Sequence, residues 1–321
     1  MRRPSRASRA GLSGGATLAA SLATLPWWAD ASTMRLVVEG VCLLVLAQMW
    51  NLLAGYGGLV SVGQQAYVGL GGYALVVLAD FAGLNPFLCV PLGGLVAALA
   101  AVPVSRIAFR LQGGYFAIGT WVIAEVFRLA VANASALGGG SGQSLIAMRA
   151  YPRELRESLT YWIALALLVA VMAGLYLLLR SRHGLALTAL RDSEVAAESQ
   201  GIDVAATKLM VYVVAAFGGG CAGALYFLMN LRISPDAAFG VSWSAFTIFI
   251  VVIGGTGTLE GPLAGTLLFF LLRETLADYG TWYLIVIGLV AVVTMLACPQ
   301  GLWGWVASRL DFSFFPLQRR I

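Results

Sequence analysis

Four acidic residues lie inside or beside apolar stretches of the chain, where an ionisable side chain is costly and often functional. Glu39, Asp80 and Glu274 fall near the ends of their stretches, close to water. Glu125 lies nearest the middle of one, and Arg128 follows it at i+3, on the same helix face. Two interpretations fit Glu125: an internal ion pair, or a polar group on a route for a solute. The acids are not evenly spaced, as a chain of proton carriers would require.

Residues for hydrolysis, metal binding or nucleotide binding are scarce. The one histidine, His183, argues against a histidine-rich metal site and a Ser-His-Asp triad. The one lysine, Lys208, follows Thr207 and lies in no Gly-Lys-Ser/Thr loop, so a P-loop is excluded. The four cysteines have no metal-ligand spacing. We expect a protein that is not an enzyme and binds no metal or cofactor itself; any ATP that drives it is bound by another chain.

A glycine-rich stretch carries the most distinctive polar groups. Between Asn51 and Tyr73, seven glycines accompany Ser61, Gln64 and Gln65. Small residues let helices approach closely, and they also permit a helix break that exposes backbone groups to a cavity. Amide and hydroxyl side chains are costly against lipid, so this stretch should face the protein interior. Close helix packing and the lining of a solute route are the two alternative roles.

A second stretch, residues 252–265, combines glycines with a proline inside a long apolar run. A third, residues 113–125, begins another apolar run. Glycines in the first two stretches are candidates for helix breaks. We assign predicted breaks to Gly69, Gly71, Gly254, Gly255 and Gly257.

The elements that must position these residues are membrane-spanning helices. Apolar residues make up 60% of the 321 residues and charged ones 11%, against about 25% charged residues in a soluble protein. Because one soluble core could not hide this surface, the excess must face lipid. A span needs about 20 apolar residues, so we predict an all-α, polytopic bundle of about ten spans. The predicted spans are 12–28, 35–55, 59–79, 87–108, 114–133, 158–180, 208–231, 242–256, 260–277 and 281–298.

The arginines predict the orientation. With the N-terminus in the cytoplasm, alternating spans place most arginines on the cytoplasmic side, as the positive-inside rule requires. We expect both termini inside, with an N-terminal tail 1–11, a transmembrane region 12–298 and a C-terminal tail 299–321. Eight spans, with one glycine-rich pair re-entrant, would give the same orientation. A cleaved signal peptide is the alternative for the first span, which ends in Ala29-Asp30-Ala31.

The longest polar stretch on the predicted cytoplasmic side is residues 181–207. Leu187, Leu190 and Val195 alternate there with charged side chains at helical spacing, and Gly201 is a suitable helix end. We expect a short helix at the membrane surface whose polar face meets a cytoplasmic partner. The basic residues lie between apolar runs rather than in a stripe, so we expect no nucleic-acid partner.

Several motifs occur along the chain in the order typical of one family. They are the Asn-Leu-Leu-x-Gly-Tyr-x-Gly-Leu-x-Ser-x-Gly stretch at 51–63, Tyr115-Phe116-Ala117, the glycines at 138–142, Gly184 to Ile202, Ser234-Pro235, Gly254-Gly255-x-Gly257, Gly261-Pro262 and Pro299-x-Gly301-Leu302. In these, residues 51–301 resemble the permeases of ATP-driven (ABC) importers for branched-chain amino acids, specifically the larger of the two permease types.

The resemblance implies a division of labour across the cell inner membrane. A periplasmic substrate-binding protein delivers the substrate, and a second permease subunit completes a path that works by alternating access. Two ATP-binding-cassette ATPase subunits bind ATP and Mg²⁺ and dock on residues 181–207, which we call the inner loop. We assign the coupling to the ATPases to Arg191, Asp192, Glu194, Ala197, Glu198 and Gly201. We assign the substrate path to Ser61, Gln64, Gln65, Tyr67, Tyr73, Tyr115 and Glu125.

The chain differs from the usual pattern of this family at two positions. Gln64 stands where many relatives have histidine, and Glu260 where they often have an aromatic residue. The same superfamily moves urea, short amides and other amino acids, which remain alternatives to a branched-chain substrate. An ion-coupled secondary transporter and a lipid-modifying membrane enzyme are alternatives of other classes. The shortage of central acids argues against the first, and the single histidine argues against the second.

Overall fold

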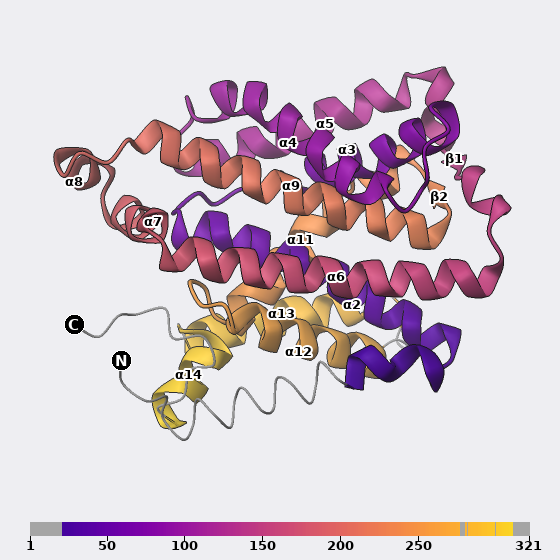
Figure 1. Ribbon diagram of the computed structural model, residues 1–321. Coiled ribbons are helices and arrows are strands. Elements are labelled where there is room, and N and C mark those ends of the chain that lie inside the picture. The colour runs from indigo at the N-terminus through magenta and orange to yellow at the C-terminus, as the bar shows by residue number, and fades with distance from the viewer. Residues whose placement is uncertain (1–20, 277–279, 281, 299, 311–321) are drawn as a thin grey trace.

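The computed structural model is a bundle of long helices that lie side by side (Figure 1). It describes residues 21–276, 280, 282–298 and 300–310. In chain order the elements are η1 (Leu25–Trp27), α2 (Ala31–Asn51), η2 (Leu52–Tyr56), α3 (Gln64–Val76), η3 (Val77–Phe81), α4 (Cys89–Ala108), α5 (Gly114–Ala132), η4 (Ser135–Leu137), η5 (Gly139–Ser141), β1 (Gln143–Ser144), η6 (Ala147–Ala150), α6 (Arg153–Arg180), α7 (Arg182–Asp192), α8 (Glu194–Ser199), α9 (Val204–Asn230), β2 (Arg232–Ile233), α10 (Pro235–Ala238), α11 (Ser242–Gly254), α12 (Gly261–Thr275), α13 (Trp282–Ala297) and α14 (Gly301–Leu310).

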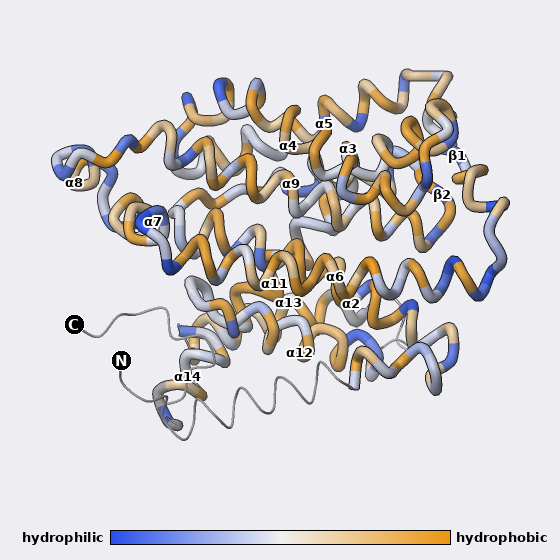
Figure 2. Tube along the Cα trace, viewed as in Figure 1, coloured by the Kyte–Doolittle hydropathy of each residue, from blue (hydrophilic) through white to orange (hydrophobic). Residues whose placement is uncertain are grey.

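Long apolar helices dominate this list. Among the described residues, six helical segments are long and apolar enough to cross a membrane, namely Ala31–Tyr56, Cys89–Ala108, Gly114–Ala132, Arg153–Arg180, Val204–Asn230 and Pro235–Gly254. A seventh is present if the bent pair Ile285–Ala297 and Gly301–Ala307 forms one span. Figure 2 shows apolar residues along the helices, with hydrophilic ones gathered at the two ends of the bundle, near α7 and α8 and near β1 and β2. The chain is therefore a multi-pass helical membrane protein.

The predicted count of about ten spans is not confirmed. Helices occupy the predicted ranges from residue 35 onward, but α3, α12 and α13 contain only 13, 15 and 16 residues. Each is shorter than the roughly 20 residues of a straight span. Most of the predicted first span and the N-terminal tail lie outside the described residues. So do both chain ends, on which the predicted orientation depends.

Close packing of α3, α4 and α9 forms the centre of the bundle. A Cβ atom at Gly71 of α3 would lie 2.0 Å from the carbonyl oxygen of Gly220 in α9, and one at Gly69 would lie 2.2 Å from the ring of Phe239. Only glycine allows helices to approach so closely. This corrects the prediction that Gly69 and Gly71 break a helix, because both lie inside the continuous helix α3.

The helices are interrupted elsewhere, at two irregular segments that we call the first break (residues 57–63) and the second break (residues 255–260). The first break follows the π-helical turn η2 and precedes α3. The second separates α11, which ends at Gly254, from α12. Gly255 and Gly257 have φ of 124° and 73°, a region that favours glycine. The second break thus lies where the sequence places it.

A short ribbon closes the end of the bundle opposite α7 and α8. Strand β1 pairs antiparallel with β2, with Gln143 opposite Ile233 and Ser144 opposite Arg232. These four residues are an exception to the predicted all-α fold. Asp80 braces the same end, because its carboxylate accepts hydrogen bonds from the backbone N–H groups of Ile146 and Ala147 at 3.0 and 2.7 Å.

The inner loop forms two helices, α7 and α8, where the sequence predicts one. Ser193 adopts an extended conformation between them, and its hydroxyl accepts a hydrogen bond from the N–H of Ala196. A serine that caps a new helix in this way ends the previous one. The predicted C-terminal tail also begins with a packed element, since Gly301 at the start of α14 lies against Gly255.

Candidate functional site

Seven buried polar side chains from four helices and the first break surround the middle of the bundle. We call this set the polar junction, and it consists of Gln48, Asn51, Ser61, Gln64, Gln65, Thr120 and Ser244. Its hydrogen bonds hold the first break inside the protein. The hydroxyl of Ser244 in α11 donates to Oε1 of Gln65 and lies 3.1 Å from the carbonyl oxygen of Val62. The backbone N–H of Val62 donates to Oγ1 of Thr120 in α5 at 3.1 Å.

Two amides at the end of α2 tie the second break to the same place. Gln48 donates from Nε2 to the carbonyl oxygen of Leu259 at 2.7 Å. Asn51 donates from Nδ2 to the carbonyl oxygen of Thr258 at 2.7 Å and accepts at Oδ1 from the N–H of Gly257 at 2.8 Å. Both helix breaks therefore meet the end of α2. Breaks of this kind, inside a bundle, are where transporters commonly bind their substrates.

Several hydrogen-bonding groups of the polar junction have no partner in the part of the chain that the structure describes. Gln64 is 1% exposed, and neither its Nε2 nor its Oε1 has a hydrogen bond among the described residues. The same holds for Nε2 of Gln65 and Oε1 of Gln48. A buried polar group without a partner costs about 1–3 kcal/mol. Such a concentration in an apolar bundle indicates a place that water or a polar solute fills.

The structure brings together only part of the predicted substrate path. Ser61, Gln64 and Gln65 lie in the polar junction. Tyr67 follows on α3, where its buried ring packs edge-on against Tyr212 at 5.7 Å between centroids.

The other three predicted path residues lie apart from the junction. Tyr73 lies further along α3, stacked on Phe239 at 6.0 Å between centroids. Tyr115 lies at the start of α5, where it is 77% exposed. Glu125 is engaged in an ion-pair network of its own.

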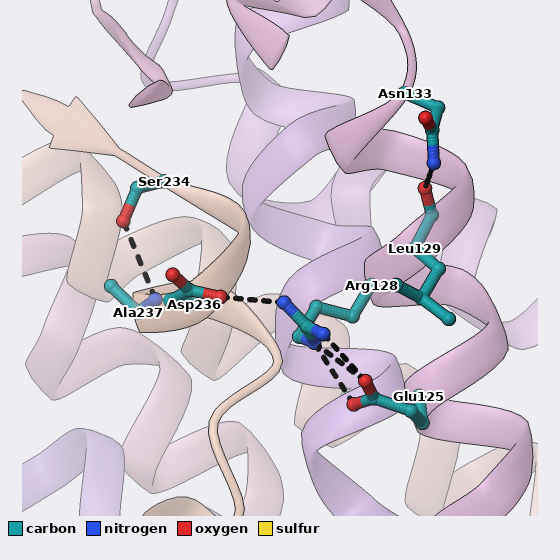
Figure 3. A network of polar contacts seen from close by, with 7 residues as sticks. All are labelled: Glu125, Arg128, Leu129, Asn133, Ser234, Asp236 and Ala237. Carbon is teal, nitrogen blue, oxygen red and sulfur yellow. Dashed lines mark hydrogen bonds and ion pairs between the residues drawn. The ribbon is translucent and has the colours of Figure 1, made fainter. Parts of the chain in front are cut away.

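Glu125 forms an ion pair with Arg128, which was one of the two interpretations of this residue. Figure 3 shows the guanidinium of Arg128 between two carboxylates from different elements. Its Nε lies 2.9 Å from each oxygen of Glu125, and its Nη1 lies 2.7 Å from Oδ1 of Asp236 in α10. Arg128 thus ties α5 to α10. This geometry accounts for Glu125 without a role on the path.

Three of the six predicted ATPase contacts interact with other parts of this chain. Arg191 donates from Nη1 to the carbonyl oxygen of Gly55 in η2 at 3.2 Å, and Glu194 pairs with Lys208 of α9 at 2.6 Å. Ala197 is fully buried in a small core with Leu190 of α7. The prediction that Ala197 meets a partner is therefore wrong for this conformation.

Five of the six predicted contacts, namely Arg191, Asp192, Glu194, Glu198 and Gly201, are exposed on the inner loop. Asp192, Glu198 and Gly201 are the exposed ones that bond to no distant part of the described chain. Val195 of α8 is exposed as well, by 78%, although its spacing had placed it on the apolar face of a helix. Helix α8 therefore presents the acidic side chains of Glu194 and Glu198 to solvent together with the apolar side chain of Val195.

Comparison with known protein families decides where this arrangement belongs. The model of the family described as "Branched-chain amino acid transport system / permease component" matches residues 32–296. The chain belongs to this permease family. The predicted resemblance is confirmed, and the family is one of transport subunits. ABC permeases work in general with ATPase and substrate-binding partners.

Named relatives of this permease agree with the family match. It is 29% identical to the high-affinity branched-chain amino acid transport system permease protein LivM of Salmonella typhimurium, over 85% of this chain and 69% of the relative. The LivM protein of Escherichia coli is 28% identical over 86% of this chain and 71% of its own. A probable LivM protein of Methanocaldococcus jannaschii is 26% identical over 70% of this chain and 69% of its own. No solved structure matches the permease.

Sequence reasoning missed four members of the permease's polar junction. Gln48 and Asn51 are amides at i and i+3 in the apolar second half of α2, and this spacing could have placed them on one interior face. Thr120 and Ser244 carry no such signal, because single hydroxyl residues are common in membrane helices. Their place depends on contacts with the first break, which only the folded chain reveals.

Proposed function

We propose that this permease carries apolar, branched-chain amino acids across the inner membrane as one subunit of an ABC importer. Family membership supports the transport class, and the LivM relatives support the substrate class. The observation that carries the proposal is the polar junction, a set of buried amides with unmet hydrogen bonds where two helix breaks meet. Alternating access would open this junction to each side in turn.

The chemistry of the junction suits a small zwitterion with an apolar side chain. Crossing a bundle requires polar groups for the ammonium and the carboxylate, because an unpaired charge in an apolar interior is costly. The free amide atoms of Gln48, Gln64 and Gln65 offer both donors and acceptors. The neighbouring rings of Tyr67 and Tyr212 offer apolar surface to the substrate's side chain.

The same proposal assigns the energy source to other chains. Two ATPase subunits with ATP and Mg²⁺ would dock on the exposed part of the inner loop, at Asp192, Glu198, Gly201 and Val195. A second permease subunit would complete the path, and a periplasmic binding protein would supply the substrate. The exposed apolar side chains of the outer helices, such as those of Leu99 and Leu267, would meet lipid or the second permease.

A second candidate is the same importer class with urea or a short amide as substrate. The free amide groups of Gln64 favour it, since an amide pairs well with another amide. An ion-coupled transporter is the alternative of another class, and it would require that this chain alone takes up the substrate.

Competition for uptake separates the substrate candidates. The complete importer is reconstituted in proteoliposomes, and ATP-driven uptake of labelled L-leucine is measured with excess unlabelled L-isoleucine, L-valine, urea or acetamide. We expect strong competition by isoleucine and valine and none by urea or acetamide. Strong competition by urea, or urea uptake exceeding leucine uptake, would contradict a branched-chain substrate.

A further inference from the structure

The amino end of helix α3 lies inside the bundle and is uncapped. Gly63 is the N-cap residue and offers no side-chain hydrogen bond. The backbone N–H groups of Gln64 and Gln65 have no acceptor among the described residues. The first N–H groups of a helix carry a partial positive charge and ordinarily find a side-chain or solvent acceptor. Here both lie in residues that are at most 1% exposed.

The side chain of Gln64 is a second, independent sign that a polar ligand binds here. Both its amide atoms are buried without a partner at the first position of α3. Gln64 lies between α3 and α9, since a Cβ atom at Gly219 would lie 3.6 Å from its Oε1. Leu46 of α2 lies against the same glycine position at 3.8 Å. The amide oxygen of Gln64 thus lies beside Gly219 of α9 and near the apolar side chain of Leu46, with no hydrogen-bond partner among the described residues.

We propose that the amino end of α3, together with the amide of Gln64, binds the α-carboxylate of the transported amino acid. The proposal rests on the proposed function and names the part of the substrate that this end of α3 recognises. A carboxylate is the anion that a helix amino end and an amide N–H both favour. It would accept hydrogen bonds from the free N–H groups of Gln64 and Gln65 and from Nε2 of Gln64. The free oxygen of Gln48 is then available to the ammonium group.

Ligand analogues test which charge the site recognises. The assembled importer, without nucleotide or binding protein, is titrated calorimetrically with L-leucine, isocaproate and isoamylamine. Isocaproate retains the carboxylate without the ammonium, and isoamylamine retains the ammonium without the carboxylate. We expect leucine and isocaproate to bind and isoamylamine to bind at least about tenfold more weakly. Binding of isoamylamine as tight as that of isocaproate would overturn the proposal.

Two variants test the location. Gln64→Leu removes the amide at similar volume and is expected to weaken leucine and isocaproate binding about tenfold, as loss of a hydrogen bond to a charged group does. Gly219→Ala places a methyl group beside Gln64 at ordinary contact distances of 3.4 to 3.8 Å, so it should fold and weaken leucine binding several-fold. Gly174→Ala in α6 is the matched control, because a Cβ there meets nothing within 4 Å.

The outcomes separate this proposal from the proposed function. Leucine binding that is intact in the wild type and unchanged in Gln64→Leu and Gly219→Ala would overturn the carboxylate site alone. A wild-type importer that binds none of the three probes would contradict the proposed substrate class and the site together. Size-exclusion profiles of each variant establish that the complex is intact before titration.

Discussion

Arg191 of helix α7 donates a hydrogen bond from its guanidinium to the backbone carbonyl of Gly55, at 3.2 Å. Gly55 in turn lies against the second break, since a Cβ atom there would lie 2.6 Å from the backbone nitrogen of Gly257. Asn51 bonds the same nitrogen from the end of α2. One arginine therefore connects the inner loop to both helix breaks that border the polar junction.

This contact predicts that Arg191→Ala weakens the link between the ATPases and the path. We expect leucine uptake by the reconstituted importer to fall about tenfold, the size of a lost hydrogen bond from a charged donor, while ATP hydrolysis falls much less. The measured quantity is the ratio of ATP hydrolysed to leucine transported. Arg182→Ala, at the other end of α7, is the control and should leave this ratio unchanged. An equal ratio in both variants would contradict the coupling role.

Charge reversal on the inner loop separates a docking residue from a structural one. Glu198→Lys exchanges an exposed acid and should reduce co-purification of the ATPases several-fold. Glu194→Lys breaks the pair with Lys208, so its effect should be reversed by adding Lys208→Glu, which restores an opposite pair. Full ATPase binding by Glu198→Lys, or no rescue of Glu194→Lys by the second change, would show that these roles are assigned wrongly.

The Arg128 network predicts a stability effect. Asp236→Asn removes the carboxylate charge from the tie between α5 and α10, while the pair with Glu125 remains. A partly exposed ion pair contributes about 0.2–1 kcal/mol, so the melting temperature in detergent should fall by only a few degrees. Arg153→Ala breaks a pair with Glu157, one turn away in the same helix α6, and should lower the melting temperature less. Loss of leucine transport without loss of stability in Asp236→Asn would instead place this network on the path.

Glycine packing predicts a larger effect. Gly71→Ala forces a methyl group to within 2.0 Å of the Gly220 carbonyl, so α3 and α9 must separate. Overpacking of this kind typically costs 1–3 kcal/mol and often more against rigid backbone. We expect a marked loss of folded, monodisperse protein by fluorescence-detected size-exclusion, while Gly174→Ala matches the wild type. A normal yield of Gly71→Ala would contradict the close approach of the two helices.

The sequence predicted the membrane class and the interior position of the first glycine-rich stretch for sound physical reasons. A soluble fold cannot bury apolar runs that recur throughout a chain. The polar side chains of Ser61, Gln64 and Gln65 would cost too much free energy if they faced lipid. The helical inner loop was also predictable. Ser193, followed by Glu194, was a recognisable cap signal that would have divided it into α7 and α8.

Other features depend on partners far along the chain. A glycine in a membrane helix either packs or breaks the helix, and the role of Gly71 is decided by Gly220 on α9. The burial of Ala197 follows from its contact with Leu190 across the turn between α7 and α8. The number of spans is hard to predict from short helices such as α11 and α12, because the second break divides one apolar run into two pieces.

The most direct test of the account is uptake of labelled L-leucine into proteoliposomes that contain the complete importer and its binding protein. We predict accumulation that requires this chain and enclosed ATP, persists when an ionophore collapses ion gradients, and falls about tenfold in Gln64→Leu. Leucine uptake by this chain alone, without ATP and abolished by the ionophore, would contradict an ABC permease that moves its substrate through the polar junction.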